Sequence, residues 1–141
     1  MSRIRSKDTE PELLVRRELH KRGFRFRIHV ASLPGKPDIV LRRHATIIQV
    51  KGCFWHGHSC LGGRVPSGNY WRQKITRNRA RDRRCDRQLA ALGWRVLTIW
   101  ECRIRRRSQG DLDRFFEALF AGHFARSPSA IPAPRAYAVV V

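Results

Sequence analysis

A dense group of cysteines and histidines lies near the middle of this chain of 141 residues. The group comprises Cys53, His56, His58 and Cys60, and Cys102 follows far downstream at the end of an apolar run. Structural zinc takes four nitrogen or sulfur ligands in a tetrahedron, and a short Cys/His loop closed by a distant fourth ligand is a usual pattern. The spacing therefore predicts a zinc site with one spare candidate, and one such arrangement leaves His56 out.

Two other interpretations of the cysteines stay open. Reduced cysteines beside incidental histidines would need no metal, and a disulfide framework would need an oxidising compartment. Nothing near the N-terminus resembles a secretory signal, so we expect disulfides least of the three.

Two apolar runs before the Cys/His loop predict a β-hairpin, with strands over residues 37–41 and 45–51. Because side chains alternate between the two faces of a strand, we expect Asp38 to face Gln49 and Lys51. Mg²⁺ prefers oxygen ligands, so Asp38 is a candidate ligand, and Lys51 would orient the attacking water or stabilise charge developing on a phosphodiester. An ordinary surface aspartate and lysine would give the same local pattern.

The segment before the hairpin predicts a helix over residues 9–22, opened by a capping box of Thr9 and Glu12. Glu12 also lies at the polar end of the inward stripe of this helix. It therefore either caps the helix or reaches the metal site. Residues 24–30 alternate apolar and polar side chains and predict a half-buried strand.

A long helix is predicted over residues 69–92, because apolar residues recur there at spacings of three and four. Asn78 and Asp82 interrupt its inward stripe, and we expect them to form hydrogen bonds at the periphery of the site. Cys85 is expected to be a small core residue and not a ligand.

Two more elements complete the expected domain. Residues 94–100 form an apolar run that predicts a central strand ending near Cys102. Asp111 is expected to cap a last helix with a core-facing apolar stripe. Residues 124–141 are rich in Pro and Ala and predict a loose tail, whose final residues would add to a sheet edge.

The formal net charge of +19 indicates a polyanionic partner, and nucleic acid is the first choice. The long helix carries eight basic residues against two acidic ones, which fits a surface that tracks phosphates. A basic protein that is merely soluble, or that coats membranes, is the alternative. No apolar run approaches membrane-spanning length, so we expect a cytoplasmic, nucleoid-associated protein without a membrane partner.

Three segments of the chain resemble the signature blocks of the very-short-patch mismatch repair endonucleases: ASLPGKPD at residues 31–38, GCFWHGHSC at residues 52–60 and LGWRVLTIWEC at residues 92–102. The resemblance covers roughly residues 1–120. It implies an α/β, restriction-endonuclease-like fold, in which a mixed β-sheet is flanked by α-helices and carries an embedded structural zinc site. It also implies Mg²⁺-dependent nicking of one DNA strand beside a T:G mismatch left by deamination of 5-methylcytosine, with a 5′-phosphate at the nick.

The resemblance also assigns roles to individual residues. It implies that Asp38 and the backbone carbonyl of Val50 hold Mg²⁺, that His56 lies near the attacking water, and that Glu12 is a supporting acid. The zinc ligands that it implies are Cys53, His58, Cys60 and Cys102. The expected DNA-contacting residues are Phe54 and Trp55 as aromatic wedges, with Trp71, Lys74, Arg77 and Arg81.

Position 51 departs from the family pattern. The best-known members have a histidine where this chain has Lys51, and that histidine is thought to assist proton handling. We expect Lys51 to retain cleavage chemistry with a different pH dependence, because lysine is no near-neutral base unless burial lowers its pKa.

The resemblance implies one nuclease domain over residues 1–123, with a basic arm at residues 1–8. We expect a monomer that acts on duplex DNA with a T:G mismatch, together with mismatch-repair proteins and a cytosine-5 methylase system. Three alternatives remain: a zinc-stabilised DNA-binding module without cleavage activity, a general structure-selective endonuclease, and a loop in which Phe54 and Trp55 form a small core and do not act as wedges.

Overall fold

The computed structural model describes residues 7–60, 63–124 and 138–140. Its centre is one mixed sheet with the strand order β1-β2-β3-β4-β5. The strands are β1 (Arg27–Ile28), β2 (Ile39–Leu41), β3 (Thr46–Lys51), β4 (Arg95–Trp100) and β5 (Ala138–Val140). The first three strands pair antiparallel, whereas β4 runs parallel to both β3 and β5.

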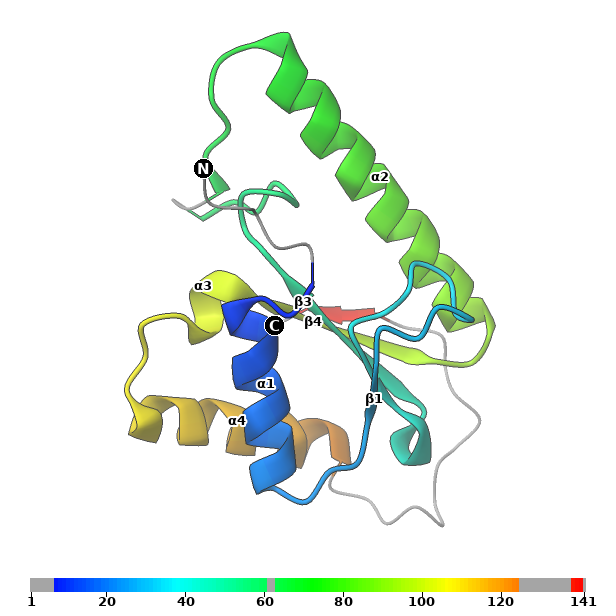
Figure 1. Cartoon of the computed structure of the whole chain (residues 1–141), viewed down its shortest axis with the longest axis vertical. Helices are drawn as coiled ribbons and strands as arrows, with labels where there is room; N and C mark the ends of the chain where they lie inside the picture. Colours follow the sequence, from blue (N-terminus) through cyan, green and yellow to red (C-terminus); the bar gives the residue numbers. More distant parts are fainter. Residues whose placement is uncertain (1–6, 61–62, 125–137, 141) are drawn as a thin grey trace.

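Helices lie on both sides of this sheet (Figure 1). They are α1 (Glu10–Lys21), α2 (Asn69–Ala91), the short α3 (Glu101–Ile104) and α4 (Gln109–Phe124), and the single turn η1 (Arg42–His44) joins β2 to β3. Parallel neighbours need a crossover connection, and α2 supplies it between β3 and β4. In the part of the chain that the structure describes, no helix is long and apolar enough to cross a membrane. The architecture is the mixed sheet flanked by helices that was expected.

The strands place alternate side chains in two different cores. One core joins Ile48 and Val50 to residues of α1 and α4, and it includes the fully buried Phe116. The opposite core joins Ile47 to Leu89 of α2. Period-two alternation therefore places Gln49 and Lys51 on one face of β3, as the sequence predicted, and this is the face that α2 covers.

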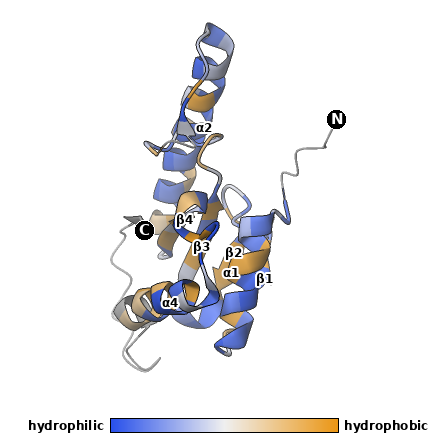
Figure 2. Ribbon diagram, turned by 90° about the vertical axis from the view of Figure 1, so that its left-hand side faces the viewer, coloured by the Kyte–Doolittle hydropathy of each residue, from blue (hydrophilic) through white to orange (hydrophobic). Residues whose placement is uncertain are grey.

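The N-terminal part of α2 extends beyond the sheet (Figure 1), and Figure 2 shows that this helix is largely hydrophilic. Only Ile75 and Leu89 are buried along its length, in the described structure. Leu89 anchors the helix to the sheet, and Ile75 anchors it to the loop that follows β3. The loop and the helix therefore support each other outside the main core.

Three local predictions were wrong in detail. The strand expected over residues 24–30 is only Arg27–Ile28: the Phe24 N–H still bonds to the end of α1, and His29 adopts a positive φ of 47°. Asp111 lies inside the first turn of α4, where its N–H donates to Ser108 Oγ. The chain after β4 turns directly into α3, so Cys102 lies on a helix rather than at a strand end.

Candidate active site and metal centres

The residues expected to carry catalysis meet in one cavity of about 790 Å³. It opens where α1, the loop before β2, the end of β3 and the middle of α2 come together. Its walls include Glu12, Asp38, Val50, Lys51 and His56, together with Trp55, Arg81, Asp82, Asp86 and Glu101. Five residues separated by up to 44 positions in the chain are thus brought to one place. The sequence and the family resemblance named these residues but did not show how they are arranged.

Asp38 is held at the inner end of this cavity by the backbone of β3. The Val50 N–H donates to Asp38 Oδ2 at 2.8 Å, and the Asp38 N–H donates to Gln49 Oε1 at 3.4 Å. Burial raises the pKa of Asp38 to about 6, although the Val50 hydrogen bond opposes the shift and the nearby Glu12 charge adds to it. A carboxylate that is costly to ionise without a cation suits a metal ligand.

The Val50 carbonyl is available on the same side of the strand. In a β-strand, the N–H and C=O of one residue point in the same direction, and the Val50 N–H points at Asp38. One carboxylate and one carbonyl oxygen are a donor set that suits Mg²⁺, which fills its remaining positions with water and substrate. The residues present therefore fit the expected ion.

His56 is oriented by an acid from α2. Its Nδ1 lies 2.5 Å from Asp82 Oδ2, and Asn78 Nδ2 donates to the Trp55 carbonyl at 2.9 Å. Burial disfavours ionisation of Asp82, but the hydrogen bond and charge of His56 outweigh it and hold the Asp82 pKa below its ordinary value. Asn78 and Asp82 thus do form hydrogen bonds at the site periphery, and an ionised Asp82 fixes the His56 tautomer.

The loop approaches α2 closely because residue 57 is a glycine. Gly57 has a φ of +61°, and a Cβ there would come within 2.7 Å of the Ile75 side chain. Any larger residue would push the loop away from the helix. The glycine therefore permits the contact between His56 and Asp82.

Glu12 belongs to the helix cap and also lines the cavity, so the two positions that the sequence left open do not exclude each other. Its N–H bonds to Thr9 Oγ1 at 3.4 Å, as in a capped helix, while its carboxylate lines the cavity and accepts the Asp8 N–H at 3.0 Å. Asp8, Glu12 and His29 are close enough to share a metal ion. However, the Arg16 guanidinium bonds to all three, at 2.7, 3.1 and 2.8 Å, so a protein cation already balances this acidic group.

Lys51 extends toward α2. Its Nζ lies 3.7 Å from Asp82 Oδ2 and 3.6 Å from Asp86 Oδ2. The ammonium group therefore forms a bridge between two acids one helical turn apart, and it shares Asp82 with His56. Nothing in the sequence pattern had identified Asp86.

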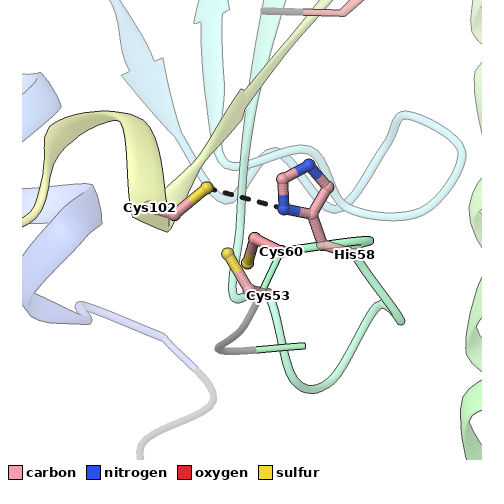
Figure 3. A group of neighbouring side chains, drawn as sticks. All are labelled: Cys53, His58, Cys60 and Cys102. Carbon is pink, nitrogen blue, oxygen red and sulfur yellow. Dashed lines mark hydrogen bonds between the residues drawn. The ribbon is translucent and has the colours of Figure 1, made fainter. Parts of the chain in front are cut away.

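The second expected centre is formed by the loop after β3 and by α3. Cys53, His58, Cys60 and Cys102 place one ligand atom each within 4.8 Å of one another. Figure 3 shows the four side chains converging, with His58 Nδ1 bonded to Cys102 Sγ at 3.5 Å. Tetrahedral ligands at the usual zinc bond lengths lie about 4 Å apart, so the donor set fits zinc.

The three thiols of the cluster differ in their pKa. The hydrogen bond to His58 lowers the pKa of the Cys60 thiol to about 7, and the thiolate is the form that binds a metal, whereas burial raises the pKa of Cys53 to about 12 and also raises that of Cys102. His56 and Cys85 lie outside the cluster. Cys85 instead packs beneath Gly35, where a Cβ would come within 2.8 Å of its sulfur, and it is half-buried at the cavity wall rather than in the core.

An aromatic cluster lies beside the metal loop, the segment over residues 52–60 that follows β3 and carries three of the candidate zinc ligands. Phe54, Trp55 and Trp71 pack in pairs with ring centroids 5.2 to 5.9 Å apart, and each is half-buried. Lys74 Nζ lies 5.2 Å from the Trp55 ring centre and 5.8 Å from that of Trp71. The rings pack on one another as a small cluster and keep part of their surface toward solvent, and their role as wedges stays a prediction.

The basic residues of α2 extend from this cluster along the helix. Arg77 and Arg81 are exposed, and Arg81 also lines the cavity. The other exposed arginines of α2 are Arg72, Arg79, Arg83, Arg84 and Arg87. The metal loop, the aromatic cluster and the basic residues of α2 are therefore neighbours.

Comparison with known proteins gives matches over most of the chain. Residues 1–62 match the family model of the DNA mismatch endonuclease Vsr. The type II nicking enzyme V.XorIIP of Xanthomonas oryzae pv. oryzae is 50% identical over 106 residues, which cover 74% of this chain and 78% of that protein.

Two more relatives agree with these matches. The type II nicking enzyme V.NmeAIP of Neisseria meningitidis serogroup A is 43% identical, over 77% of this chain and 79% of its own length. The DNA mismatch endonuclease Vsr of Escherichia coli K12 is 42% identical, over 77% of this chain and 71% of its own length. The similarity thus extends well beyond the segments on which the resemblance was first based.

Proposed function

We propose that this chain, which belongs to the Vsr family of DNA mismatch endonucleases, nicks one strand of duplex DNA beside a T:G mismatch left by deamination of 5-methylcytosine, in a Mg²⁺-dependent reaction. The family makes it an endonuclease that acts on DNA. The observation that carries the finer proposal is the meeting of Asp38, His56 and the half-exposed Trp55 in one cavity.

In this proposal Asp38 and the Val50 carbonyl hold Mg²⁺. When bound, the ion supplies positive charge that stabilises the phosphodiester as negative charge develops on it. Asp38 must be ionised to do so, and its raised pKa means that a proton competes for the same site. Glu12 lines the same cavity as a supporting acid, with its charge paired to Arg16.

His56 is the proposed general base. With its Nδ1–H directed to Asp82, the neutral ring carries its basic lone pair on Nε2, which can take a proton from the attacking water. Asp82 stabilises the imidazolium that forms. Lys51 adds a positive charge to the same cavity, where it would stabilise the negative charge that develops on the phosphate.

Zinc, held by Cys53, His58, Cys60 and Cys102, is proposed to fasten the loop that presents His56 and the aromatic cluster. A mismatched step resists unstacking least, so wedges formed by Phe54, Trp55 and Trp71 would favour T:G over paired DNA. Lys74, Arg77 and Arg81 would contact the phosphates around it. We further propose a restriction-endonuclease-like fold and action on nucleoid DNA together with mismatch-repair proteins and a cytosine-5 methylase system.

The test is a nicking assay on a labelled duplex with one T:G pair and on the matched duplex, for the wild type, Asp38→Ala and the control Asp113→Ala. Asp113 lies on α4 in an ion pair with Lys21, remote from the cavity walls. Mg²⁺ is omitted rather than chelated, so that zinc is not stripped. We expect cutting of the T strand that needs Mg²⁺, is lost in Asp38→Ala and persists in Asp113→Ala.

Two other results would replace this proposal. Equal cutting of mismatched and matched duplexes would indicate a general endonuclease of the same family. Tight DNA binding without cutting under any divalent metal would indicate a binding module.

A further inference from the structure

The Asp82 carboxylate interacts with two side chains, His56 and Lys51. Its Oδ2 is the hydrogen-bond acceptor for His56, and the same oxygen lies 3.7 Å from Lys51 Nζ. If the Lys51 ammonium moved closer to Asp82 Oδ2, it would compete with His56 for this acceptor. A further group must therefore hold the ammonium away from Asp82.

We propose that Asp86 is a positioning residue of the nicking reaction, which holds the Lys51 ammonium between α2 and β3 so that Asp82 remains the acceptor for His56. The proposal rests on the function proposed above. It assigns to Asp86 no contact with DNA and no proton transfer. Its effect passes through Lys51.

The geometry of the three side chains supports this role. Lys51 Nζ is 3.6 Å from Asp86 Oδ2 and 3.7 Å from Asp82 Oδ2, so neither acid holds it alone. All three side chains are mostly enclosed, with exposed fractions of 11% for Lys51, 17% for Asp82 and 20% for Asp86. Charges that are largely removed from water interact more strongly than surface pairs.

The placement of the two acids on α2 also supports it. Asp82 and Asp86 are separated by four residues and face the same side, where two like charges repel. Lys51 lies between them and offsets that repulsion. Burial raises the pKa of Asp86, and the Lys51 charge opposes this shift, so the ion pair helps to keep Asp86 ionised.

A simple structural role for the ion pair predicts a different outcome from a positioning role. If Asp86 only stabilises the fold, its loss lowers the melting temperature and leaves the turnover of the folded protein unchanged. If it positions Lys51, its loss lowers the nicking rate at saturating DNA without weakening DNA binding. The second effect must also disappear once Lys51 is gone.

The experiment is a double-mutant cycle of Asp86→Asn and Lys51→Gln in single-turnover nicking of T:G duplex, with Asp113→Asn as the matched control. We expect Asp86→Asn to slow nicking by about five- to tenfold, which is the coupling usual within one ion-pair network. Its dissociation constant for DNA should stay unchanged. In the Lys51→Gln background the same substitution should have almost no effect, and Asp86→Glu should restore most of the rate. An equal loss in both backgrounds, or none in either, would overturn the proposal.

A second readout does not depend on nicking. In protein labelled with ¹⁵N-histidine, the His56 Nδ1–H signal, assigned with His56→Ala, reports its hydrogen bond to Asp82. We expect Asp86→Asn to shift this proton upfield, whereas Asp86→Glu and Asp113→Asn leave it in place. An unshifted signal in Asp86→Asn would refute the positioning role. Failure of the wild type to nick T:G DNA would refute the proposed function instead.

Discussion

Asp38 occupies a position that favours function over stability. Its environment raises its pKa from 3.8 to about 6, so the ionised form that a cation needs is the form that the folded protein disfavours. The ionised carboxylate therefore lowers the stability of the folded protein at neutral pH. Its replacement should therefore have opposite effects on stability and activity.

We predict that Asp38→Asn abolishes nicking but stabilises the folded protein at neutral pH. Because the native pKa is raised, the native state binds this proton more tightly than the unfolded chain does. The resulting stability is fully present below about pH 3.8 and is lost as the pH rises through about 6. The free energy of unfolding of Asp38→Asn should exceed that of the wild type by up to about 3 kcal/mol near pH 7.5 and by roughly half of that near pH 5.

Urea unfolding of both proteins between about pH 5 and pH 8, without Mg²⁺, measures this difference. Asparagine can still accept the Val50 N–H, so the packing of β3 should be preserved. A stability difference that does not change with pH would show that the Asp38 charge is not its source.

The His56–Asp82 pair gives a second prediction at this scale. Asp82→Asn should lower the nicking rate about 100-fold or more, the usual contribution of a well-placed general base, because an amide can present its N–H to His56 and reverse the tautomer. DNA affinity should remain close to that of the wild type. The nicking rate and the DNA affinity, both measured on the same T:G duplex, separate an effect on catalysis from an effect on binding. A nicking rate of Asp82→Asn within a fewfold of the wild type would exclude His56 as the base.

Individual residues differed in how far the sequence could identify them. Asp38 and three of the four proposed zinc ligands lie in short segments with a recognisable spacing, so they could be named in advance. The pairing of Lys51 with Asp86, and of Arg16 with His29, joins separate elements. No local pattern carries such contacts, because they depend on the angle at which a helix crosses a strand.

At the scale of the elements, the metal loop and α2 depend on each other. The loop contacts α2 through Gly57 and Ile75, and Cys102 ties it to α3. Neither contact lies in the main core around Phe116. Bound zinc should therefore determine how firmly His56 and the aromatic rings are presented.

We predict that Cys102→Ser removes most of the bound zinc and destabilises the protein by on the order of 2 kcal/mol, which corresponds to a melting temperature lower by about 5–10 °C. Nicking should fall with it, because the loop that carries His56 is released from α3. Cys85→Ser, which changes a thiol outside the cluster, should keep its zinc. Metal content and thermal unfolding test both variants, and full zinc occupancy in Cys102→Ser would refute the ligand set.

Strong periodicity predicted most elements well, and weak periodicity did not. Alternation along β3 gave the face of every residue from Ile47 to Lys51, since one side had to pack on α1 and α4 and the other on α2. Alternation over residues 24–30 correctly gave Phe24 and Phe26 as packed against the core, but it did not give the short strand, because the Phe24 N–H bonds to the end of α1 and Ile28 is exposed. Tertiary packing decided the outcome where the segment was short and at an edge.

Across the whole molecule, acidic residues are few and many of them meet in one place. The protein has 11 acidic residues and a net charge of +19, and five of these acids line the cavity described above, beside Lys7, Lys36, Lys51 and Arg81. The arginines of α2 are exposed on the outside. Carboxylates in the cavity can bind a cation, while the exposed arginines of α2 attract the DNA backbone.

The charge of this exterior predicts how DNA binding depends on salt. Each phosphate contact that is lost should make the slope of log K against log [salt] less negative by about 1. Arg77→Gln, on the exposed face of α2, should therefore reduce the slope by about 1 and weaken T:G and matched duplexes alike. Arg114→Gln on α4, where the arginine is paired with Asp111, should leave the slope unchanged. Fluorescence anisotropy titrations at several salt concentrations measure both slopes, and equal slopes for the two variants would show that α2 is not the face that binds DNA.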